Sequence, residues 1–158
     1  MNRGARIRSL ALAAVTGWLS GALITTPIQL VELVRNTAGD LRLMLVSLAL
    51  GLILWGIWTL AIALVGVALA GLPIALWASP TWLLRHRVAI IAVSAAVGLA
   101  VPLAKFRAWD WLKPEPFYDL PLIAMYGIFA SVFAAVTALL YLRMLQKKVP
   151  GGAADSLR

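Results

Sequence analysis

Four long stretches of this sequence contain no acidic or basic residue, and all charges fall in the short segments around them. The charge-free stretches cover residues 9–31, 43–84, 88–104 and 120–142. A helix needs about 20 apolar residues to cross the roughly 30 Å hydrocarbon core of a bilayer, and these stretches reach or approach that length. Hydrophobic residues make up 63% of the 158 residues, against roughly half in an ordinary soluble domain. The pattern predicts an all-α, polytopic membrane protein.

We expect a bundle of four transmembrane helices in one domain of residues 1–148, followed by a disordered tail at 149–158. The expected spans are about 9–31, 43–70, 82–104 and 120–142. Because Ser79-Pro80 has the form of a helix N-cap and first helical residue, the third helix is expected to begin before Val88. Gly71-Leu72-Pro73 leaves open a re-entrant hairpin, but an exposed turn would have unpaired backbone groups in lipid. A continuous, tilted second helix is therefore favoured.

Basic residues divide unequally between the two sides of this arrangement. The side with both termini and the second loop has nine, namely Arg3, Arg6, Arg8, Arg85, Arg87, Arg143, Lys147, Lys148 and Arg158. The other side has five, namely Arg35, Arg42, Lys105, Arg107 and Lys113. The positive-inside rule then places both termini in the cytoplasm. The compact, Ala-, Leu- and Arg-rich chain suggests a bacterial inner membrane, and the long first apolar run predicts a retained helix rather than a cleaved signal peptide.

Small residues recur at helical spacing in three of the expected spans. Lipid tails are as apolar as leucine, so membrane helices associate through close packing, which small residues permit. These positions therefore predict packing faces within the bundle, with docking of another membrane protein or a second copy as the alternative. The positions are Ala13, Gly17, Gly21 and Thr25 in the first span, Ser94 and Gly98 in the third, and Gly127 and Ser131 in the fourth.

The most polar passage inside any span is Thr25-Thr26-Pro27-Ile28-Gln29. Proline removes a backbone donor and bends a helix, and neighbouring threonine and glutamine side chains repair such a kink. The alternative interpretation is that Thr25, Thr26 and Gln29 line a polar pathway near the outer leaflet.

Two segments at the membrane surface combine aromatic and charged residues. On the cytoplasmic side, Trp82, Arg85, His86 and Arg87 are expected to contact lipid headgroups. On the outer side, residues 105–119 are expected to lie on the interface or to present a surface to a partner protein. The aromatic residues of that outer segment are Phe106, Trp109, Trp111, Phe117 and Tyr118.

The sequence contains no motif for catalysis, a metal or a cofactor. It has no cysteine and one histidine, and the expected spans hold no ionisable group of the kind that marks proton-coupled transport. Its net charge of +8 follows from membrane topology, so nucleic acid is not an expected partner. The leading hypothesis is an accessory, assembly or interaction subunit of a membrane complex, whose partners are the lipid bilayer and another membrane protein or a second copy.

Two other classes of function remain as alternatives. One is a transporter or channel component that forms its pathway as an oligomer. The other is a membrane enzyme acting on lipid-linked substrates through Asp110, Glu115, Asp119 or His86.

Overall fold

The computed structural model describes residues 3–37, 40–110 and 120–148, and this part of the chain is helical apart from short connections. Four of its helical segments are long and apolar enough to cross a membrane, which confirms the expected number of long apolar helices. These segments are Arg3–Arg35, Leu41–Trp77, Arg87–Ala104 and Ala124–Lys148. The elements are α1 (Arg3–Thr37), α2 (Leu41–Gly66), the π-helical turn η1 (Val67–Gly71), α3 (Leu72–Trp77), α4 (Pro80–Arg85), α5 (Arg87–Asp110) and α6 (Leu120–Lys148).

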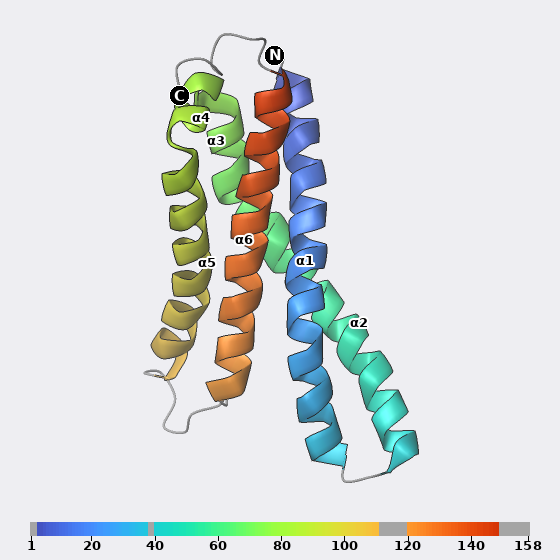
Figure 1. The fold of residues 1–158 in the computed structure, drawn as a ribbon. Coiled ribbons are helices and arrows are strands. Elements are labelled where there is room, and N and C mark those ends of the chain that lie inside the picture. Colours follow the sequence, from blue (N-terminus) through green and yellow to red (C-terminus); the bar gives the residue numbers. More distant parts are fainter. Residues whose placement is uncertain (1–2, 38–39, 111–119, 149–158) are drawn as a thin grey trace.

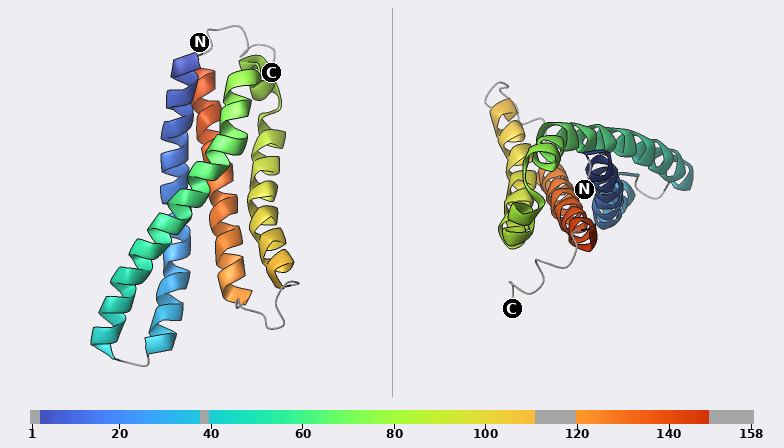
Figure 2. Two further views of the ribbon diagram at one scale, coloured as in Figure 1. Left: turned by 180° about the vertical axis from the view of Figure 1, so that it is seen from behind. Right: turned by 90° about the horizontal axis from the view of Figure 1, so that it is seen from above.

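The long helices run alternately up and down, so that both ends of the described chain lie at the same end of the bundle (Figure 1). Viewed along the bundle, α6 lies between α1 and α5 (Figure 2). The α2 helix crosses the bundle obliquely and leans away from α5 and α6 at the opposite end (Figures 1 and 2). The last helix, α6, is thus the central element of the bundle, and α2 is the most peripheral.

The second long segment continues from Leu41 to Trp77 without the hairpin that Gly71-Leu72-Pro73 left open. Its continuity depends on the π-helical turn at Val67–Gly71, where the backbone N–H of Leu72 donates to the carbonyl of Val67. Pro73 has no N–H, so the backbone carbonyl four residues earlier lacks its usual hydrogen-bond donor. The wider turn directly before Pro73 accommodates this gap, and the segment bends there instead of ending.

The third long segment differs from the expected helix starting near residue 82, because His86 interrupts it. Ser79 caps α4 as expected, accepting a hydrogen bond from the backbone N–H of Trp82 at 3.2 Å. His86 then leaves helical geometry at φ −103° and ψ 23°, and α5 starts at Arg87. The carbonyl of Trp82 is bonded by both the backbone N–H and the ring Nδ1 of His86. Only the bond from the ring is foreign to a regular helix, and the helical bonding resumes at once, since the N–H of Ile90 donates to the carbonyl of His86 at 2.9 Å.

Glycines bring α6 close to both of its neighbours. A Cβ on Gly17 would lie 2.8 Å from the carbonyl oxygen of Phe133, and one on Gly21 would lie 2.9 Å from the ring of Phe129. On the other side of α6, a Cβ on Gly98 would lie 2.8 Å from the carbonyl carbon of Ala130. Such separations are too short for any side chain larger than hydrogen. The packing of α1, α5 and α6 therefore depends on backbone-to-backbone contact.

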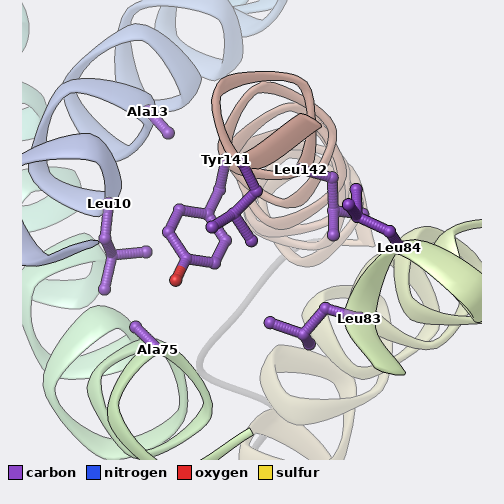
Figure 3. Packing of buried hydrophobic residues seen from close by; sticks show 8 residues of the cluster. Leu10, Ala13, Ala75, Leu83, Leu84, Tyr141 and Leu142 are labelled. Atoms are coloured by element: carbon purple, nitrogen blue, oxygen red, sulfur yellow. The ribbon is translucent and has the colours of Figure 1, made fainter. Parts of the chain in front are cut away.

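Buried side chains form two clusters, and α6 contributes to both. The cluster nearest the termini contains Leu10, Ala13, Ala75, Leu83, Leu84, Tyr141, Leu142 and Leu145. In it, the ring of Tyr141 lies among Leu10 of α1, Ala75 of α3 and Leu83 of α4 (Figure 3). The cluster in the other half contains Trp55, Ala63, Met125, Phe129, Ala130 and Phe133. The short helices α3 and α4 thus complete the packing at one end only.

Replacing Gly98 by alanine tests the contact between α5 and α6. We expect Gly98→Ala to lower the free energy of unfolding by about 1–3 kcal/mol, because the added methyl group overlaps backbone atoms of α6. Gly56→Ala is the matched control, since nothing lies within 4 Å of a Cβ at that position. Alanine favours a helix over glycine, so the control should be neutral or stabilising. Equal thermal unfolding midpoints for the two variants in lipid would contradict the assigned contact.

Candidate functional site

The small residues singled out in the sequence lie mainly in contacts between helices of the same chain. Ala13, Gly17, Gly21 and Thr25 are buried on α1, and Gly127 is buried on α6. Gly98 faces α6, while a Cβ on Gly127 would lie 2.9 Å from the side chain of Leu99. Ser94 and Ser131 are half-buried. These faces are occupied inside the bundle, which leaves little of them for a docking partner.

The hydroxyl groups around Pro27 are bonded within their own helix. Thr25 is fully buried and its Oγ1 donates to the carbonyl of Gly21 at 2.9 Å, while Thr26 donates to the carbonyl of Ala22 at 2.7 Å. Both acceptors precede Leu23, whose carbonyl is the one that Pro27 leaves without its usual donor. The threonine hydroxyls are therefore bonded to the turn of α1 that precedes Pro27. Gln29 is half-buried, and its amide nitrogen is buried without a hydrogen-bond partner.

A polar bond between α1 and α2 was not predicted from the sequence. The indole Nε1 of Trp18 donates to Oγ1 of Thr59 at 3.1 Å, and Thr59 donates in turn to the carbonyl of Trp55 at 2.8 Å. Thr59 is fully buried. Nothing in an apolar segment distinguishes this threonine beforehand, because its partner is 41 positions away in the chain.

The expected headgroup contact at Trp82, Arg85, His86 and Arg87 lies at the corner between α4 and α5, and all four side chains are exposed. The rings of Trp82 and His86 are 4.8 Å apart with an interplanar angle of 34°. The Nδ1 of His86 is 3.0 Å from the carbonyl oxygen of Trp82, which can only accept, so Nδ1 carries a proton. The ring is thereby fixed with Nε2 available at the surface.

Sequence reasoning also missed a polar junction inside the same end of the bundle. Arg6 is only 8% exposed, and its guanidinium donates through Nη2 to the carbonyl of Ala78 in the α3–α4 connection. Ser9, one turn further along α1, accepts a hydrogen bond from Nζ of Lys148 at 2.9 Å. A signal was available, since the small-residue face of α1 extended back by seven positions from Ala13 reaches Arg6.

Several predicted residues lie outside what the structure describes. Trp111, Phe117 and Tyr118 of the expected outer surface, and the carboxylates Glu115 and Asp119, fall in residues 111–119. Phe106, Trp109 and Asp110 lie on α5, but their side chains are not described. Within residues 3–37, 40–110 and 120–148, no group of three or more His, Cys, Asp or Glu residues gathers in a way that would hold a metal ion.

Comparison with known proteins adds no relative, since no family model, curated protein or solved structure matches the chain.

A double-mutant cycle on Trp18 and Thr59 tests the bond between α1 and α2. We expect Trp18→Phe and Thr59→Val each to lower stability, with a coupling free energy of about 0.6–1.7 kcal/mol, as for other hydrogen bonds between membrane helices. The quantity to measure is the unfolding free energy of the four proteins in lipid. Strictly additive effects would show that the two side chains do not interact.

Proposed function

We propose that the chain is a polytopic protein of a bacterial inner membrane and serves as an accessory or assembly subunit that binds another membrane protein through α2. The observation that carries the proposal is the incomplete cover of α2. Its buried residues are Trp55, Thr59 and Ala63, and none of the residues from Leu41 to Leu54 is buried. Lipid or another protein must cover the rest of this apolar helix.

One stripe of α2 is suited to close contact with another helix. Its residues recur at alternating spacings of four and three, which is the pattern of helices that pack at a shallow left-handed angle. We call this stripe the α2 flank. All but the half-buried Ser47 are exposed, and a Cβ on Gly51 would meet nothing within 4 Å. The α2 flank consists of Ser47, Gly51, Leu54, Trp58, Ala61 and Val65.

The open surroundings of Gly51 distinguish it from four glycines of the other long helices. Gly17, Gly21, Gly98 and Gly127 would each bring a Cβ within 3 Å of atoms of a neighbouring helix. Those glycines are used for packing within the chain, whereas Gly51 offers the same close approach with nothing against it. The open glycine therefore favours α2 as the surface that binds a partner. The small-residue faces of α1, α5 and α6 are less suited to that role, because they are already packed within the chain.

The distribution of charge supports insertion with both termini in the cytoplasm. The first turns of α1, the α4–α5 corner and the last turns of α6 lie at one end of the bundle (Figure 1). Among the described residues of that end, eight are basic and none is acidic, namely Arg3, Arg6, Arg8, Arg85, Arg87, Arg143, Lys147 and Lys148. Such an excess marks the cytoplasmic side.

The two alternatives have less support from the described residues. A transport pathway through Thr25 and Thr26 would need their hydroxyls, and both donate to carbonyls of their own helix. An enzyme would need groups that act together, but His86 lies at the basic end while Asp110 lies at the far end of α5 (Figure 1). An accessory role requires neither arrangement.

Substitution on the α2 flank tests the proposed binding. We expect Gly51→Leu to reduce the recovery of a co-purifying membrane protein by about tenfold or more, because a bulky side chain separates the two helices. The measurement is mass determination of the chain extracted in native lipid particles. Ala49→Leu is the matched control, about 160° away around α2. A complex unaffected by Gly51→Leu, or a single bare chain in the wild type, would refute the proposal.

Cysteine labelling tests the orientation, since the native chain has no cysteine. With an impermeant maleimide, we expect Leu41→Cys to be labelled in intact cells, and Gln146→Cys only after the inner membrane has been opened. Both side chains are exposed and they lie at opposite ends of the bundle. The reverse pattern would show that the termini lie outside the cytoplasm. Labelling of both cysteines in intact cells would refute the placement of the two ends of the bundle on opposite sides of the membrane.

A further inference from the structure

The junction around Arg6 contains a buried positive charge. Arg6 is 8% exposed, and Nη2 donates to the carbonyl of Ala78. Its Nε is buried and has no hydrogen-bond partner. Tyr141 of α6 lies beside the guanidinium, and its buried hydroxyl is the neutral side-chain group that interacts with it. The partners that surround this cation are therefore neutral.

No carboxylate of the described chain balances Arg6. The acidic residues in the described ranges are Glu32, Asp40 and Asp110, which all belong to the opposite end of the bundle. A buried charge is costly unless an opposite charge accompanies it. The structure thus has a buried guanidinium with no acidic partner among the described residues.

A second cation lies at the same junction. Lys148, at the end of α6, donates through Nζ to Ser9 Oγ at 2.9 Å, and Ser9 is itself buried and donates to the carbonyl of Ala5. Ser9 lies one turn from Arg6 on the same face of α1. The ammonium group of lysine has three hydrogens to donate, and Lys148 is exposed. Arg6 and Lys148 therefore bring two cations of different helices to one corner.

We propose that this corner binds the phosphate of an anionic phospholipid, with Arg6 as the principal ligand and Lys148 as the second. Guanidinium groups bind phosphate through paired, charge-assisted hydrogen bonds. Anionic lipids are concentrated where basic residues meet the cytoplasmic leaflet, and exposed Trp82 at the same end marks that interface. The site is distinct from the α2 flank, and it rests on the proposed membrane insertion.

The test uses the full chain in lipid nanodiscs of phosphatidylcholine, with or without phosphatidylglycerol. Native mass spectrometry during gradual delipidation counts the lipids that stay bound. We expect the wild type to retain one phosphatidylglycerol, and Arg6→Gln to reduce its retention by about tenfold or more, as for loss of a charge-assisted pair. Arg3→Gln is the matched control, because Arg3 is exposed on the same helix and the change in charge is identical. It should retain the lipid.

Arg6→Lys keeps the proposal testable if Arg6→Gln fails to fold. Lysine preserves the charge but not the planar pair of donors, so the retained phosphatidylglycerol should fall while the unfolding midpoint in phosphatidylcholine is maintained. Equal loss in Arg3→Gln and Arg6→Gln would overturn the site in favour of diffuse charge attraction. A third outcome would assign the anion to the chain itself. In that case the protein would show no preference for phosphatidylglycerol, and Asp155→Asn would lower the unfolding midpoint as Arg6→Gln does. The lipid site would then be overturned in favour of a carboxylate of the chain. Failure to enter either nanodisc would instead refute membrane insertion.

Discussion

The close contact of α6 with α1 on one side and α5 on the other determines the arrangement of the remaining helices. In a lipid environment, apolar side chains gain little by leaving the hydrocarbon for one another, so association depends on how closely two backbones approach. Gly17 and Gly21 permit that approach on α1, and Gly98 permits it on α5. The three helices form a compact unit on which the other elements rest. The α3 and α4 helices cover its basic end, where Tyr141 fills the space between them (Figure 3).

The attachment of α2 follows a different principle. Its inner half contacts the unit through Trp55, Thr59 and Ala63, and a polar bond joins Thr59 to Trp18. The π-helical turn before Pro73 changes the direction of the segment, so α3 aligns with the bundle while α2 leans away from it (Figure 2). One helix thereby serves two purposes, since its inner end belongs to the packed unit and its outer part presents an apolar surface to the surroundings.

The sequence predicted the long helices well because their signal is spread over many residues. Charge-free stretches identify four apolar helices, and Ser79 with Pro80 marks the start of α4. Features that depend on single contacts escaped prediction. Neither Lys148 with Ser9 nor Trp18 with Thr59 has a local signature, because each pair joins distant parts of the chain. Likewise, the ring of His86 bonds the carbonyl of Trp82 where the helix breaks, and residue spacing does not reveal this contact.

The pairing of the first helix with the last has a consequence for biosynthesis. The glycine face of α1 packs against α6, with Gly17 beside Thr137. Because α1 precedes α6 by about 100 residues in the chain, it is synthesised long before its partner. Chains emerge from the ribosome at about 5–20 residues per second, which separates the two helices by several seconds. In the proposed membrane setting, α1 waits in the bilayer with an open glycine face throughout that interval. Insertion factors or nascent neighbours have access to this face only then, before α6 arrives and closes it.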